Sequence, residues 1–135
     1  MQPQKFVVTA LLAAVLLFAI GGFVYGSALA DFFAANMAAG ITKEPAEFWA
    51  IFVGELAGGT LLTLVIAGWA RVGTAGAGAK VGAVMALMMT INFDFVLYGT
   101  SNVANLTAAC VDVLVNTVRY AVVGGFVGWM TGRGR

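Results

Sequence analysis

Four apolar runs, each about as long as a membrane-spanning helix, dominate the sequence. They cover residues 6–26, 48–70, 81–100 and 106–130. An α-helix rises about 1.5 Å per residue, so about 20 apolar residues cross the hydrocarbon core of a bilayer. The first run carries no charge, and the others are interrupted only by Glu55, by Asp94, and by Asp112 with Arg119. The pattern predicts an all-α fold: an integral membrane four-helix bundle formed as one domain by residues 1–135.

The composition supports this prediction and excludes several classes of function. Hydrophobic residues make up 61% and charged residues 10% of the chain, against about 45–50% and about 25% in soluble domains. The few Lys and Arg residues are scattered, so nucleic acid is not an expected partner. The absence of His excludes His-ligated haem, the usual zinc sites and Ser–His catalysis. We therefore expect neither a metal nor a cofactor.

The first apolar run also resembles a secretory signal peptide. Lys5 precedes it, and Ala28-Leu29-Ala30 resembles a cleavage site. The run is nevertheless long enough to span a bilayer, and we expect it to be the first membrane helix.

The connections between the runs differ in character. Residues 28–39 are rich in helix-forming residues and precede Gly40, so they predict a short interfacial helix between the first two spans. Pro45 is expected near the first turn of the second long helix. Residues 71–80 are rich in Gly and Ala and are expected to form a flexible loop.

The distribution of charge predicts the orientation of the bundle. Four spans place both termini on one side, and basic residues concentrate on the cytoplasmic side of membrane proteins. Lys43 is expected on the opposite side, among acidic residues. Tryptophans and tyrosines are expected at the two interfaces: Trp69 and Trp129 inside, and Tyr25, Trp49 and Tyr98 outside. The basic residues expected on the cytoplasmic side are Lys5, Arg71, Lys80, Arg133 and Arg135.

Ionisable residues inside the apolar runs are the candidates for a functional site. Each costs about 2.5–3.5 kcal/mol to insert near the bilayer centre, so such residues usually have a role. Glu55, Asp94 and Asp112 lie about 10–12 Å along their helices from the outer ends. Three different helices would therefore bring acids to a similar depth, and Arg119 is the one cation among the spans.

Helical spacing extends this group to polar neighbours. Asp112, Asn116 and Arg119 follow one another at i, i+4 and i+7, which places them on one helix face. Tyr98 lies one turn beyond Asp94. We expect Arg119 to pair inward with one of the acids, with Asn116 adding a hydrogen bond. The predicted ligand- or ion-binding residues are Glu55, Asp94, Tyr98, Asp112, Asn116 and Arg119.

Two interpretations of the cluster remain open. It could fix helix register only, with Arg119 neutralising one acid. Alternatively, the excess of acids over cations could bind or pass a proton, a cation or a small solute. The second interpretation predicts a small, non-enzymatic, multi-pass membrane protein that forms a homo-oligomer.

An accessory role is the main alternative function. GxxxG pairs allow helices to approach closely, within the bundle or against a larger membrane complex. Such a protein would contribute a packing surface instead of a polar site. An enzyme is less favoured, because no nucleophile–base pair is visible. The pairs are Gly22/Gly26, Gly54/Gly58 and Gly124/Gly128.

Several short segments resemble a known group of proteins. Residues 22–26 (Gly-Phe-Val-Tyr-Gly), 31–33 (Asp-Phe-Phe), 37–44 and 125–129 (Gly-Phe-Val-Gly-Trp) occur in the order found in the DUF1761 family. That family consists of small bacterial four-helix membrane proteins. The resemblance implies the same topology in a bacterial inner membrane, and it implies no particular mechanism.

Overall fold

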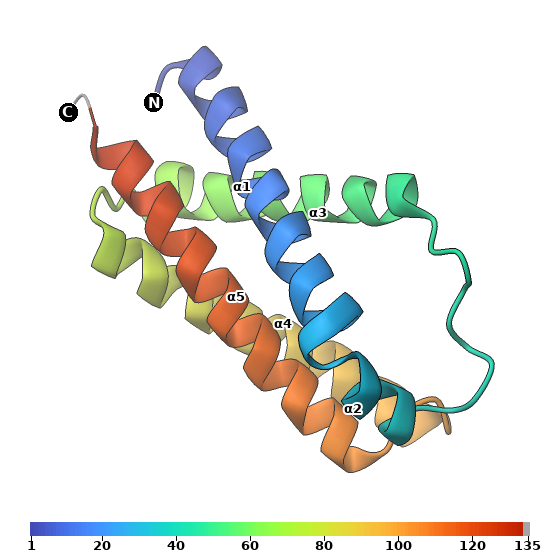
Figure 1. Ribbon diagram of the computed structural model, residues 1–135. Helices are drawn as coiled ribbons and strands as arrows, with labels where there is room; N and C mark the ends of the chain where they lie inside the picture. Colours follow the sequence, from blue (N-terminus) through green and yellow to red (C-terminus); the bar gives the residue numbers. More distant parts are fainter. Residues whose placement is uncertain (134–135) are drawn as a thin grey trace.

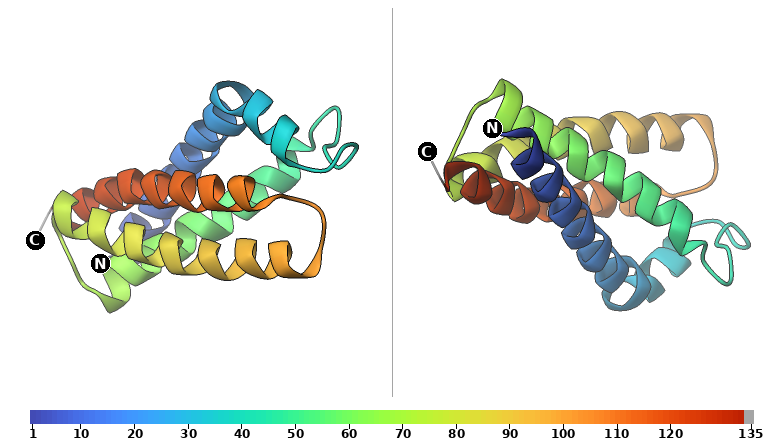
Figure 2. Two further views of the ribbon diagram at one scale, coloured as in Figure 1. Left: turned by 90° about the horizontal axis from the view of Figure 1, so that it is seen from below. Right: turned by 90° about the horizontal axis from the view of Figure 1, so that it is seen from above.

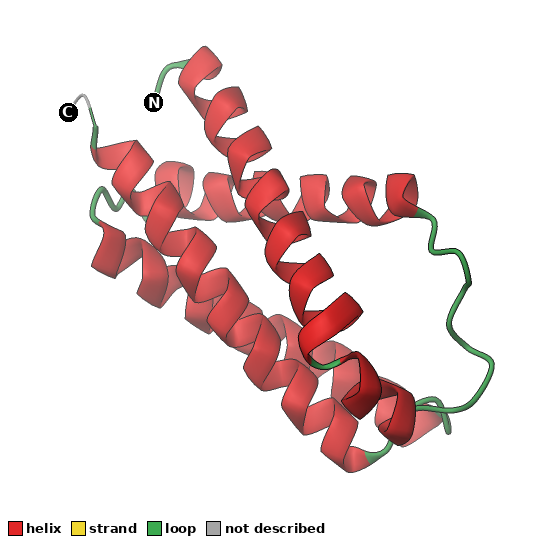
Figure 3. Cartoon of the chain, in the orientation of Figure 1, coloured by secondary structure: helices red, strands yellow, loops and turns green. Residues whose placement is uncertain are grey.

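The computed structural model describes residues 1–133, and all the named elements in that range are helices. Four helical stretches are long and apolar enough to cross a membrane, which confirms the predicted number. A short fifth helix lies between the first two of them (Figures 1 and 3). The elements are α1 (Pro3–Phe23), η1 (Val24–Ala28), α2 (Ala30–Asn36), α3 (Phe48–Thr63), η2 (Leu64–Trp69), α4 (Ala75–Thr100) and α5 (Leu106–Gly132), in which η1 and η2 are π-helical continuations of α1 and α3.

Three connections differ from the sequence-based expectation. The α4 helix begins at Ala75, inside the segment expected to be a loop, because the Thr74 side chain caps it by accepting a hydrogen bond from Ala77 N. The α2 helix ends at Asn36, four residues before Gly40, since the next residues pair with the chain after α4. The prediction for Pro45 was wrong: α3 begins only at Phe48.

The α4 and α5 helices form a tightly packed antiparallel hairpin, side by side in the left view of Figure 2. Glycines face one another across it: a Cβ at Gly78 would overlap the carbonyl oxygen of Gly124 and lie 2.9 Å from Gly128 Cα. The predicted packing role of Gly124 and Gly128 is therefore confirmed, within the bundle. By contrast, no atom lies within 4 Å of a Cβ built at Gly22.

The α1 and α3 helices cross at a similar close contact (Figure 2, right). A Cβ at Gly59 would lie 2.6 Å from Ala14 N and 2.8 Å from Ala10 O. From this crossing the two helices diverge toward α2 and the long 37–47 connection (Figure 1). The divergence leaves room for polar side chains near that end of the bundle.

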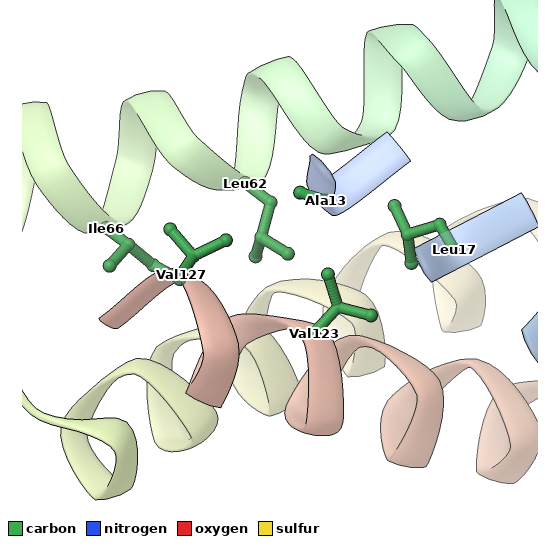
Figure 4. Close-up of a cluster of buried hydrophobic side chains, with 6 residues drawn as sticks. All are labelled: Ala13, Leu17, Leu62, Ile66, Val123 and Val127. Atoms are coloured by element: carbon green, nitrogen blue, oxygen red, sulfur yellow. The ribbon is translucent and has the colours of Figure 1, made fainter. Parts of the chain in front are cut away.

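A fully buried apolar cluster holds α1, α3, η2 and α5 together (Figure 4). On α1, α3 and α5, the residues of this cluster lie between the ionisable or polar residues of the apolar runs and the end of the bundle that carries both termini. Lys5 joins the two termini there, because its ammonium group donates to the backbone carbonyls of Thr131 and Arg133. Arg135, predicted on the same side, lies outside the described residues. The cluster consists of Ala13, Leu17, Leu62, Ile66, Val123 and Val127.

Candidate functional site

Arg119 and Glu55 form a buried ion pair between α5 and α3. Arg119 Nη1 lies 2.8 Å from Glu55 Oε1 and 3.3 Å from the carbonyl oxygen of Leu17, and only 9% of the arginine is exposed. Gly21 makes this geometry possible, because a Cβ there would overlap Nη1. The structure thus confirms that Arg119 pairs inward, and it selects Glu55 among the three expected acids.

A second polar group connects α5 to the end of α1. The Tyr25 hydroxyl donates to Asp112 Oδ1 at 2.5 Å and accepts a hydrogen bond from Asn116 Nδ2 at 3.0 Å. Asn116 Nδ2 also lies 3.1 Å from Asp112 Oδ2. Asn116 therefore adds a hydrogen bond in the cluster, as expected, and its partners are Asp112 and Tyr25.

Asp94 faces this second group from α4. It is 8% exposed, and its carboxyl group interacts with that of Asp112. Its Oδ2 atom is buried without a hydrogen-bond donor. Two carboxylates are both acceptors, so this oxygen needs a donor from elsewhere: a shared proton, a cation or a water molecule. We call Asp94 and Asp112 the acid pair.

The structure divides the expected single cluster into two compartments. The acid pair lines a cavity of about 340 Å³, whereas Glu55 and Arg119 line a separate cavity of about 520 Å³. Tyr25 lies in the wall of both. Within residues 1–133, no three carboxylate, Cys or His side chains gather as a metal site would require.

Tyr98 lies apart from both compartments. It is 43% exposed and lines an open depression of about 700 Å³ between the end of α2 and the α4–α5 connection. Its spacing from Asp94 is correct for one helix face, but near the end of α4 that face meets the depression beside α2 and not the acid pair. The periodicity therefore identified Asp94 correctly and placed Tyr98 with it wrongly.

Tyr25 is the central residue that sequence reasoning assigned elsewhere. It was expected in the outer aromatic belt, yet it contacts Asp112 and Asn116 and lies with its ring 5.9 Å from the Arg119 guanidinium carbon. A signal was present in the sequence: the buried face of α1 runs through Ala14, Leu17 and Gly21 at helical spacing. Tyr25 continues that face by one more turn.

Comparison with protein-family models, curated proteins and solved structures finds no match for this chain. The resemblance to the DUF1761 family stays a prediction. Function must therefore be argued from the two compartments themselves.

Proposed function

We propose that this chain is a multi-pass membrane protein of the bacterial inner membrane, with both termini in the cytoplasm. Four helices of sufficient length and hydropathy support insertion. Large apolar side chains such as Phe23, Phe93 and Leu114 are exposed on the outside of the bundle, where lipid would cover them. Lys5 and Arg133 lie at one end of the molecule, which fits the cytoplasmic concentration of basic residues.

Single introduced thiols test this topology in the background Cys110→Ala, which removes the exposed native cysteine. Gly76→Cys and Lys43→Cys lie at opposite ends of the bundle. In intact cells, a membrane-impermeant maleimide should label Lys43→Cys, and Gly76→Cys should react only after the membrane is opened. Labelling of both thiols from the same side would contradict the four-span arrangement.

We further propose that the acid pair binds and releases a proton or a small cation. The observation that carries this proposal is the buried Oδ2 of Asp94, which has no hydrogen-bond donor and faces a second carboxyl group. A buried carboxylate in contact with a second, half-buried one repels it strongly unless a positive charge lies between them. Arg119 does not supply that charge, because its guanidinium group donates to Glu55 and to the carbonyl oxygen of Leu17.

Helix register alone does not account for this arrangement. The Glu55–Arg119 pair already provides a charge-neutral link between α3 and α5. The acid pair adds carboxyl groups between α4 and α5, two helices that are already held together by the close backbone contacts at Gly78 and Gly82. A group that is costly to bury and unnecessary for packing is best explained by binding.

Infrared difference spectroscopy tests the proposal in detergent or in vesicles. Lowering the pH within the neutral range, where exposed carboxylates stay ionised, should produce the C=O stretch of a protonated carboxyl group, and Asp94→Asn should abolish that signal. Asp31→Asn is the matched control, since Asp31 is exposed on α2. If the spectrum of Asp94→Asn is the same as that of the unaltered protein, the acid pair does not bind the proton.

An accessory role has one observation in its favour. Gly22, Gly26 and Gly54 face open space, so a helix of another protein could approach there. Such a contact would leave the acid pair unexplained. We therefore place the accessory role second.

A further inference from the structure

The cavity beside the acid pair is far larger than a proton or a metal ion needs. Its volume of about 340 Å³ falls within the roughly 300–1,000 Å³ range of pockets that hold organic ligands. A single water molecule occupies about 30 Å³ of liquid. A bare ion would leave most of this space to solvent.

The walls of the cavity are apolar and partly aromatic. Tyr25 and Asp112 stand at one side and Asp94 at another, while the remaining lining is almost entirely hydrocarbon. Phe33 packs against Tyr25 with ring centroids 5.3 Å apart, which presents two aromatic rings beside the carboxyl groups. Aromatic faces attract cations, including alkylated ammonium groups. The other principal lining residues are Met37, Phe93, Leu97 and Ala108.

We propose that the cavity binds an organic ammonium ion, a primary amine with a small apolar body. This inference rests on the proposed cation binding by the acid pair and specifies its ligand. The carboxyl groups of Asp94 and Asp112 would separate to admit the ammonium group, whose N–H groups would then supply the donors that the buried Asp94 Oδ2 lacks. The apolar body would contact Phe33, which lines the same cavity.

Charge balance predicts that a proton leaves the acid pair when an ammonium ion binds. The empty acid pair holds one proton and carries one negative charge. An ammonium ion that enters replaces this proton, so that two carboxylates face one ammonium group and the site keeps the same net charge. One proton is released to solvent for each amine bound.

Benzylammonium chloride is a suitable probe, with benzyl alcohol as its neutral analogue. In weakly buffered detergent solution, calorimetry should detect benzylammonium binding, and a pH-sensitive dye should report about one proton released for each amine bound. The carboxyl C=O signal should disappear at the same time. Benzyl alcohol and sodium chloride should give neither response.

Two variants examine the two parts of the site. Asp94→Asn should abolish both binding and proton release, whereas the control Asp31→Asn should leave them unchanged. Phe33→Leu keeps an apolar wall and removes the aromatic face, so binding should weaken by about two- to fivefold with the proton stoichiometry preserved.

The outcomes separate this inference from the proposed function. A C=O signal that depends on Asp94 but does not respond to benzylammonium would overturn the amine site and leave proton binding intact. Equal binding of benzyl alcohol, or benzylammonium binding that persists in Asp94→Asn, would also overturn it. Absence of an Asp94-dependent signal in the unaltered protein would instead contradict the proposed function.

Discussion

Replacing Arg119 by leucine is expected to lower the free energy of unfolding by about 3–5 kcal/mol, because the substitution leaves Glu55 as a buried carboxylate without its cation. The loss is largest if Glu55 stays ionised, since the substitution removes the salt bridge at 2.8 Å that neutralises this carboxylate. Thermal or denaturant unfolding in detergent, followed by helical circular dichroism, measures the change.

The double variant Glu55→Gln with Arg119→Leu should recover part of that stability, because no buried charge then remains unpaired. The exposed ion pair Lys43–Glu47 is a matched control. Its side chains are 71% and 49% exposed, so Lys43→Ala should cost less than about 1 kcal/mol. An unchanged unfolding midpoint for Arg119→Leu would mean that the buried pair does not stabilise the bundle.

The second large effect is expected in the hairpin of α4 and α5. Gly78→Ala should destabilise the protein by about 2–3 kcal/mol, because the added methyl group overlaps backbone atoms of Gly124 and Gly128 that have no rotamer to adjust. The helices must separate to accommodate it. The measurement is again the unfolding midpoint in detergent.

The same substitution two residues earlier should act differently. Gly76 also belongs to α4, but nothing lies within 4 Å of a Cβ built on it. Gly76→Ala should therefore be neutral or slightly stabilising, since alanine favours the helical backbone more than glycine does. If Gly76→Ala and Gly78→Ala lowered the unfolding midpoint equally, the close contact between α4 and α5 at Gly78 would not be the cause of the destabilisation.

Hydropathy predicted the long helices well, because the apolar character of a membrane-spanning helix extends over its whole length. The four runs coincide with the four long helical stretches to within a few residues at most ends. The exceptions arise where tertiary contacts decide. Residues 75–80 are helical because Gly78 fits against α5, and α2 ends at Asn36 because the following residues pair near Ala104.

The sequence predicted most residues of the site, but it predicted less well which of them contact one another. Helical spacing and the depth of each residue along its helix identified Glu55, Asp94, Asp112 and Arg119. An ionisable residue stands out in an apolar run. Spacing and depth did not predict which acid pairs with Arg119, since this depends on how α1 crosses α3. Tyr25 was assigned to the aromatic belt although it continues the buried face of α1 by one more turn, at the start of η1.

The apolar cluster closes the terminal end of the polar network. Beyond Arg119, the buried hydroxyl groups of Thr9, Thr63 and Thr131 donate to carbonyls of their own helices, so they form no relay toward that end. For the function that we propose, binding and release would therefore use one route, beside α2. Net transfer across the membrane would require Leu17 to separate from Val123 and Leu62.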